Sequence, residues 1–299
     1  MATSQHLLPA SAAAPPGAVP ADTPIVPRRR LGRAASGLLV ALLALAAVAS
    51  VARNRAFQWD VVAQYFGSEA VLDGLALTLW LTALTVAAGF ALGTVLAVMR
   101  LSDNPVLRAV SWGYTWLFRS TPPLVQLLFF FNIGALYPTV SLRVPFGGPE
   151  LLHARTVNLL GPTLTAVIGL TLLEAAFAAE VVRGGVLSVD RGQLEAARSL
   201  GLGRVRVLRR IVVPQAMRAI VPAAGNMLIG ALKGTSIVSV LAVHDLLYSV
   251  QLVYNQTYEI IPLLTVATLW YLAVTAVLAV GQYYLERHFG RGFRTGGAR

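Results

Sequence analysis

Long stretches without a charged residue alternate with short charged segments along the chain. An uncharged run of about 18 residues or more can cross the hydrocarbon core of a membrane as a helix. Five such runs occur, at Ala34–Ala52, Gly74–Met99, Ser120–Leu142, Thr156–Leu173 and Ile260–Leu285. A shorter sixth candidate, Ala219–Leu232, is followed by Lys233 and further apolar residues. The pattern predicts an all-α membrane protein with about six transmembrane helices.

The composition supports a membrane protein and excludes several kinds of site. Apolar residues make up 56% of the 299 residues, charged residues make up 12%, and the mean hydropathy is +0.68. A soluble domain carries about twice that charged fraction. Because the chain has no cysteine, it has no disulfide, thiolate metal site or cysteine nucleophile. The four histidines are not paired on one helix face, so no metal site is expected.

The distribution of basic residues predicts the orientation. With a cytoplasmic N-terminus, the inside segments hold 19 of the 24 basic residues, including Arg119 at the cytoplasmic headgroups. The outside loops then hold four, Arg53, Arg55, Arg143 and Arg155. This bias obeys the positive-inside rule and places both termini in the cytoplasm. Since the arginines follow one membrane face and not a soluble domain, no nucleic-acid partner is expected.

The N-terminal region divides into two predicted parts. Residues 1–33 are rich in Ala and Pro and end in a basic run, which predicts a disordered cytoplasmic tail. Residues 34–52 form an extra N-terminal transmembrane helix or, alternatively, a cleaved signal peptide. Because the apolar run is longer than the usual 7–15 residues of a signal peptide, a retained anchor is favoured.

The segment Asp190–Pro214 has the pattern of two short helices on the basic side of the membrane. Asp190 suits a helix N-cap, with Gln193 three residues later, and Gly201 suits a left-handed helix end. A second amphipathic piece, Arg204–Val213, leads to Pro214, which fits the first turn of the next helix. Such a small protrusion cannot bury its apolar face alone, so a soluble partner is expected.

This segment resembles the EAA loop of ABC importer permeases. The resemblance rests on Glu195, Ala196 and Ala197, on Gly201 six residues after Glu195, and on the Ile-Val-Val-Pro run that ends at Pro214, where Val213 replaces the usual Leu. Four further segments are similar to the polar amino acid uptake branch of that family: Gly74–Leu79, Phe118–Gln126, Gly192–Ala197 and Lys233–Ile237. Ser120 and Gly234 depart from the usual residues there. The resemblance covers roughly residues 70–286.

The resemblance implies a type I, MetI-like permease bundle over residues 70–286, with a cytoplasmic tail over 287–299. Its loop, residues 190–214, would dock on an ATP-hydrolysing partner. The implied partners are a dimer of ATP-binding subunits that hold ATP and Mg²⁺, an extracytoplasmic solute-binding protein, and a second copy or a homologous permease in the bacterial inner membrane. The chain itself has no phosphate-binding Gly-Lys-Ser/Thr loop, no catalytic set and no expected cofactor.

Two carboxylates in one apolar run are candidates for a substrate path. Charged residues inside a span are costly and usually face a polar interior. Glu174 would attract a cationic group of a substrate or pair with Lys233 in the bundle. Glu180 lies three residues from Arg183, so a path role and a structural ion pair remain equally open.

The run that follows Pro222 holds the remaining candidates, Asn226, Lys233, Thr235 and Ser236. Broken helices tend to line polar cavities, so these groups suit a substrate carboxylate, with a gate or an interhelical ion pair as the alternative. The resemblance implies import of polar amino acids, and Glu174 adds a slight preference for cationic ones. Two rivals remain: a permease for another small solute, and a membrane enzyme or scaffold.

Overall fold

The computed structural model describes residues 31–143 and 150–289, which fall into two compact units that meet at Asn54. In the first unit, helix α1 (Leu31–Arg53) begins three residues before the predicted span. Its apolar side chains are exposed along most of its length, as expected of a helix that contacts lipid. The predicted N-terminal tail lies mostly outside the described residues.

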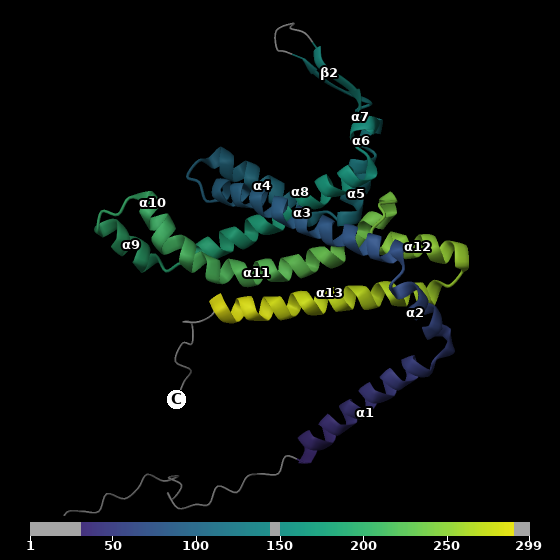
Figure 1. Cartoon of the computed structure of the whole chain (residues 1–299). Helices are drawn as coiled ribbons and strands as arrows, with labels where there is room; N and C mark the ends of the chain where they lie inside the picture. The colour runs from purple at the N-terminus through teal and green to yellow at the C-terminus, as the bar shows by residue number, and fades with distance from the viewer. Residues whose placement is uncertain (1–30, 144–149, 290–299) are drawn as a thin grey trace, which may run out of the picture. The chain divides into compact units, whose positions relative to one another are not determined.

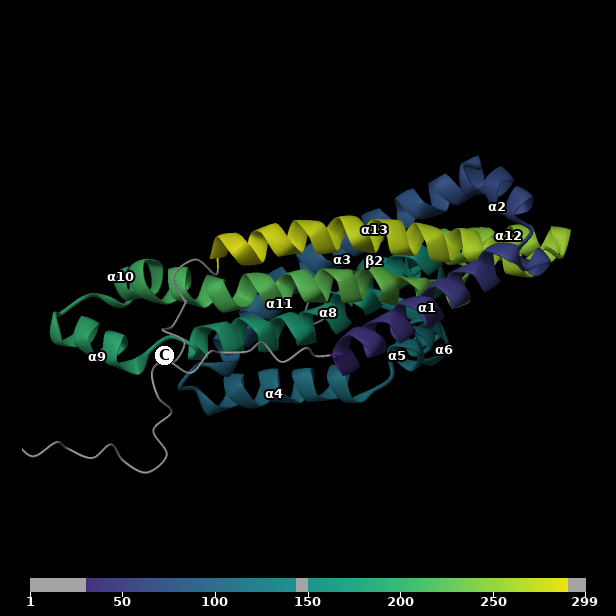
Figure 2. The same cartoon turned by 90° about the horizontal axis from the view of Figure 1, so that it is seen from below.

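The second unit is an α-helical bundle. Its elements, in chain order, are η1 (Arg55–Phe57), α2 (Trp59–Phe66), α3 (Glu69–Arg100), α4 (Pro105–Ser120), α5 (Pro123–Phe131), α6 (Ile133–Leu136), β1 (Thr139–Arg143), β2 (Glu150–Arg155), α7 (Thr156–Leu159), α8 (Pro162–Leu187), α9 (Arg191–Ser199), α10 (Arg204–Val207), η2 (Leu208–Val212), α11 (Val213–Gly234), η3 (Thr235–Leu241), α12 (Leu246–Thr257) and α13 (Ile260–Phe289). Helices α3, α8, α11 and α13 run lengthwise beside one another, with α9 and α10 at one end and α5 and α12 at the other (Figures 1 and 2).

Five helical segments in the described ranges are long and apolar enough to cross a membrane: Ala35–Arg53, Glu69–Arg100, Pro162–Leu187, Arg204–Leu241 and Ile260–Phe289. Four of the six predicted spans therefore fall within one of these helices along their whole length, or all but one residue of it. The predicted fourth span, Thr156–Leu173, is displaced, because α8 begins at Pro162 and continues to Leu187. The all-α class of the bundle is confirmed.

The predicted third span, Ser120–Leu142, is wrong as a single helix. Helix α4 has 16 residues and α5 has nine, and the chain breaks between them at Thr121 and Pro122. Both helices pack on α8, and together they extend for about 37 Å at 1.5 Å per residue, enough to cross a bilayer. The third crossing therefore begins at Pro105. A search for uncharged runs misses it because Arg108 and Arg119 interrupt the apolar pattern.

The new position of α4 also corrects the placement of Arg119. This residue lies at the end of α4 away from the α3–α4 loop, and not at the cytoplasmic headgroups. Its guanidinium sits 5.6 Å from the centre of the Phe177 ring on α8. A cation over an aromatic face is a favourable contact. Arg119 therefore lies part-way along the bundle, and it is not one of the basic residues of the α3–α4 loop.

A β-hairpin lies where the sequence predicts the end of a span and an outside loop. Strand β1 pairs antiparallel with β2, from Thr139 opposite Arg155 to Arg143 opposite Glu150. Polar and apolar residues alternate through Thr-Val-Ser-Leu-Arg in β1, a period of two that is typical of a strand. The alternation is visible in the sequence, but it covers only five residues and directly follows an apolar run, so a search for membrane spans includes most of it in the span.

Two glycines of α3 let its backbone approach α8 closely. A Cβ atom added at Gly89 would lie 2.7 Å from the Cβ of Glu174, and one at Gly93 would lie 2.6 Å from the Cβ of Ala178. A second close approach joins α8 to α11, where a Cβ at Gly185 would lie 2.4 Å from the Ile220 side chain. Small residues at such seams are how membrane helices pack tightly.

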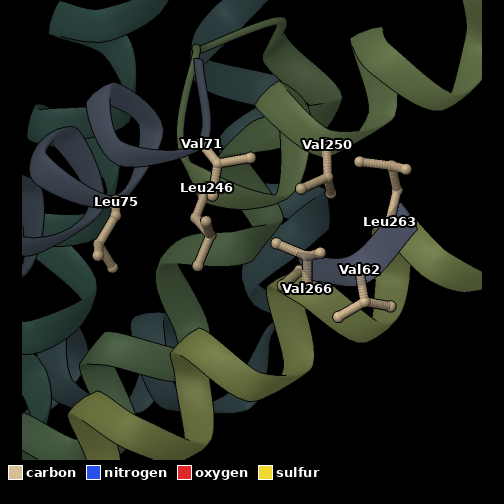
Figure 3. Packing of buried hydrophobic residues seen from close by; sticks show 8 residues of the cluster. Val62, Val71, Leu75, Leu246, Val250, Leu263 and Val266 are labelled. Carbon is tan, nitrogen blue, oxygen red and sulfur yellow. The ribbon is translucent and has the colours of Figure 1, made fainter. Parts of the chain in front are cut away.

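The other end of the bundle is held by an apolar cluster drawn from α2, α3, α12 and α13 (Figure 3). Its buried members are Val62, Val71, Leu75, Leu246, Val250, Leu263, Val266 and Ala267. The cluster fixes the end of α3 that enters the bundle. The opposite end carries the α9–α10 protrusion. One end of the bundle is therefore a packed apolar cluster and the other is a projecting pair of short helices.

Candidate functional site

The protrusion between α8 and α11 consists of two short helices, as predicted. The Asp190 carboxylate accepts a hydrogen bond of 3.1 Å from the Gln193 N–H and caps α9. Gly201 has φ of +68°, the left-handed conformation predicted for the helix end. There the Leu202 N–H donates to the Ala197 carbonyl at 3.1 Å. The Gly-Leu-Gly corner between α9 and α10 therefore closes with a standard glycine helix end.

The protrusion has an inner and an outer face. On the inner face, Leu194 and Val207 pack against the buried cluster of Val189, Val212 and Ala216, and Ala197 is buried. On the outer face Glu195 and Ala196 are exposed, and Leu200 is 78% exposed. An exposed apolar side chain at the tip of a protrusion that also exposes a carboxylate is suited to contact with another protein.

Pro214 lies in the first turn of α11, as predicted, but the chain does not leave the helical conformation before it. The chain is helical without interruption from α10 through η2 into α11, and Arg204–Leu241 forms one long helical segment. The turn before Pro214 is π-helical, with the Val213 N–H bonded to the Leu208 carbonyl. Because proline has no N–H to offer the Arg210 carbonyl, the regular ladder is broken there. The protrusion is therefore a direct extension of α11.

A side-chain hydrogen bond ties the first helix of the protrusion to the same element. The Gln215 Nε2 atom donates to the Gln193 Oε1 atom at 2.6 Å. Both helices of the protrusion are thus attached to the base of α11, one through the chain and one through this bond. Movement of the protrusion must therefore be transmitted to α11.

A cavity of about 460 Å³ lies further along α11, between that helix, α8, the start of α5 and η3. Most of its wall is apolar, including Leu170, Phe177 and Met227. Its polar side chains come from Glu174 on α8 and Asn226 on α11. The structure therefore brings together two of the predicted path residues, one on each wall.

Glu174 and Glu180 have different surroundings although they share a helix. The Glu174 side chain is 8% exposed, and among the described residues it makes no ion pair. The Glu180 carboxylate instead accepts a hydrogen bond of 2.6 Å from the Arg183 guanidinium in an ion pair, and it does not line the cavity. A buried carboxylate without a cation is a costly arrangement that a bound cation relieves.

The remaining candidates do not reach the cavity wall. Lys233 is exposed, and among the described residues it forms no ion pair with Glu174. The Thr235 hydroxyl donates to the Leu232 carbonyl at 2.7 Å, and the Ser236 hydroxyl donates to the Lys233 carbonyl at 2.8 Å. These hydroxyls are therefore engaged by their own helix. Phe177 is a wall residue that the sequence did not single out, since it resembles any lipid-facing phenylalanine.

No group of three or more His, Asp or Glu side chains that could hold a metal ion occurs within residues 31–143 and 150–289. The site consists of an apolar cavity with one carboxylate and one amide, together with an exposed protrusion.

The family described as "Binding-protein-dependent transport system inner membrane component" matches residues 89–291. The chain is 43% identical over 270 residues to the arginine transport system permease protein ArgU of Corynebacterium glutamicum. The matched region covers 89% of this chain and 83% of ArgU. It is 33% identical over 224 residues to the histidine/lysine/arginine/ornithine transport system permease protein HisM of Salmonella typhimurium. The matched region covers 73% of this chain and 92% of HisM.

Solved structures agree with these relatives. A chain from the crystal structure of an amino acid ABC transporter with histidines superposes with a TM-score of 0.63 at 30% identity, covering 73% of this chain and 94% of that one. A chain of the inward-facing MetNI methionine ABC transporter gives a TM-score of 0.58 at 19% identity, covering 74% and 99%. The second likeness concerns the fold alone.

Proposed function

The chain belongs to the family of binding-protein-dependent transport system inner membrane components, and from this we propose that it carries cationic amino acids across the membrane as a permease subunit of an ABC importer. The observation that carries the proposal is the Glu174 carboxylate, which is buried in a largely apolar cavity and has no ion partner within the described residues. The names of two relatives, an arginine permease and a histidine/lysine/arginine/ornithine permease, support the same substrate class.

In the proposed mechanism, the Glu174 carboxylate pairs with the guanidinium or ammonium group of the amino acid. The Asn226 amide, on the facing helix, offers a hydrogen bond to a polar group of the same ligand. The apolar wall excludes water, which strengthens both interactions. Because the two side chains lie on α8 and α11, separation of these helices weakens the site and releases the ligand.

ATP hydrolysis takes place in a partner subunit. Glu195, Ala196, Ala197 and Gly201 form the protrusion that docks on an ATP-binding subunit, two of which hold ATP and Mg²⁺. The continuous helix from Arg204, with Pro214 at the π-helical turn, transmits the closure of those subunits to the cavity. An extracytoplasmic binding protein delivers the amino acid, and a second copy or a homologous permease completes the pore. Both termini and the protrusion face the cytoplasm of a bacterium.

The experiment that tests the substrate class is uptake by cells that express the importer with Glu174→Gln. Arginine uptake is expected to fall at least about tenfold, since a charge-assisted hydrogen bond is worth about 1.5–3 kcal/mol. Glutamine uptake, if it occurs, should change less than about twofold. Glu69→Gln, at the exposed start of α3, is the matched control. Equal losses for arginine and glutamine would refute the role of Glu174.

The experiment that tests the coupling is Glu195→Arg, which reverses a charge on the exposed face of the protrusion. Copurification of the ATP-binding subunit should be lost, and uptake with it, while the permease remains in the membrane. A complex that contains no ATP-hydrolysing subunit, or that is indifferent to this change, would instead support a membrane enzyme or scaffold.

A further inference from the structure

A second hollow lies at the protrusion end of the bundle, on the opposite side of α8 from the α11 cavity. It has a volume of about 510 Å³ and is formed by the end of α3, the start of α4 and the end of α8. Its lining includes three arginines, Arg100, Arg108 and Arg183, one from each helix. No carboxylate lines it. Three cations that converge on one hollow from three helices are suited to an anion.

The nearby carboxylates neutralise this hollow only in part. Glu180 pairs with Arg183 and is close enough to Arg100 to interact with it electrostatically, without forming an ion pair with it. Asp103, in the α3–α4 loop, lines a different hollow beside Arg198 and Arg204. Within the described residues neither Arg100 nor Arg108 forms an ion pair; Arg100 donates one hydrogen bond of 3.3 Å to the Arg108 carbonyl. Most of the N–H donors of both guanidinium groups are therefore available.

An apolar track continues from the hollow along the outer face of α4. Trp112 lines the hollow four residues after Arg108, and Trp116 follows after four more, so all three share one face of the helix. The two indole rings stack with their centres 6.1 Å apart, and Trp112 and Trp116 are 51% and 58% exposed. A cationic hollow with an exposed aromatic track beside it matches a phosphate headgroup followed by acyl chains.

From this arrangement we infer that the hollow of Arg100, Arg108 and Arg183 binds the headgroup of an anionic phospholipid, with one acyl chain along Trp112 and Trp116. Tryptophan favours the headgroup level of a membrane, and basic pockets between helices bind acidic lipids on the cytoplasmic side. The inference shares with the proposed function only the placement of the arginine-rich end in the cytoplasm. The bound lipid would fix the α3–α4 corner against α8.

The test is native mass spectrometry of the full chain in detergent, with phosphatidylglycerol added as the anionic probe. Phosphatidylcholine with the same acyl chains is the neutral probe. The intact chain should retain phosphatidylglycerol at least about fivefold more strongly than phosphatidylcholine, and Arg108→Gln should reduce that preference about fivefold, the effect of one basic residue at a membrane surface. Arg108→Lys, which keeps the charge, should retain most of the preference.

The control is Arg155→Gln, which removes an exposed arginine from the β2 end of the bundle and should leave lipid binding unchanged. Equal retention of the two lipids, or equal loss in the Arg108 and Arg155 variants, would overturn the inference. So would displacement of phosphatidylglycerol by millimolar inorganic phosphate, because the ligand would then be a soluble anion. Thermal unfolding of each variant separates loss of the site from loss of the fold.

A second copy of the chain is the competing occupant of the aromatic track. Because the chain has no cysteine, Trp112→Cys introduces a single thiol. If the track faces lipid, oxidation should leave this variant uncrosslinked in membranes. A disulfide between two copies would overturn the lipid assignment. Neither readout depends on uptake, so failure here leaves the proposed transport function standing, and failure of uptake leaves the lipid site standing.

Discussion

The middle of α8 and its C-terminal end carry the same residue types in opposite circumstances. In the middle, Glu174 has no ion partner among the described residues, lines the largely apolar cavity beside α11 and has its backbone close to Gly89 of α3. At the end, Glu180 is partly exposed and paired with Arg183, and Gly184 has no neighbour within 4 Å of where its Cβ would be. One helix thus has a constrained region around Glu174 and, at its end, an open face at Gly184, although the next residue, Gly185, packs closely on α11.

The difference teaches that residue type alone does not identify a binding group in a membrane helix. Both glutamates interrupt the same apolar run, and a rule based on the cost of an intramembrane charge selects both. The partner supplied by the same helix, Arg183, satisfies Glu180 locally. Glu174 has no such local partner, so its charge must be matched by something that comes from outside the helix.

The largest expected effect concerns the glycines of the two regions. Gly89→Val should lower the free energy of unfolding by about 3 kcal/mol, because the new side chain overlaps the backbone of α8. Gly184→Ala should be neutral or stabilise the protein by up to about 1 kcal/mol, since the site is open and helical. Thermal unfolding in detergent measures both. Equal effects would remove the contrast between the regions.

A smaller effect is expected for the hydrogen bond that holds α4 to the middle of α8. The Tyr114 hydroxyl donates to the Leu172 carbonyl at 2.8 Å. Tyr114→Phe removes this bond without changing the ring and should cost about 1 kcal/mol. Tyr283→Phe, on the exposed face of α13, should have no measurable effect. A neutral Tyr114→Phe variant would show that the middle of α8 is less constrained than its packing implies.

The smallest effect is expected at the end of α8. Glu180→Gln should change the free energy of unfolding by less than about 1 kcal/mol, because the ion pair with Arg183 is partly exposed. A double-mutant cycle with Arg183→Gln measures the coupling directly. Uptake of arginine should change by less than about twofold. A coupling above about 2 kcal/mol would mean that the end of α8 is as constrained as its middle.

The elements with strong local signals are the ones that the sequence predicts well. Four of the six predicted spans coincide with long apolar helices, and the glycine turn at Gly201 is present with its left-handed backbone. The prediction of the third span is wrong because Arg108 and Arg119 interrupt the apolar pattern of α4 and because the helix breaks at Thr121. The Gln126 side chain secures that break by donating to the Phe118 carbonyl at 2.8 Å, a contact that no periodicity reveals.

The candidate site is predictable only in part. The protrusion around Glu195 is formed by residues close together in the sequence, so the spacing of its cap and glycine residues predicts its structure. The cavity depends on which residues of α8 and α11 face each other, and Lys233 directly precedes Gly234, which lines the cavity, yet Lys233 is exposed and does not line it. A rotation of one residue is 100° on a helix. The sequence therefore identifies the helices of the path better than the side chains on its wall.

The close contact between Gly185 and Ile220 divides the long helix from Arg204 into two arms. One arm runs back about 24 Å to Arg204 at the start of α10, and the other runs forward about 15 Å to Gly230 on the cavity wall, at 1.5 Å per residue. A helix pinned near its centre behaves as a lever with a fulcrum. Under the proposed function, a push of a few ångströms on the tip is expected to tilt the cavity wall by a comparable distance in the opposite direction.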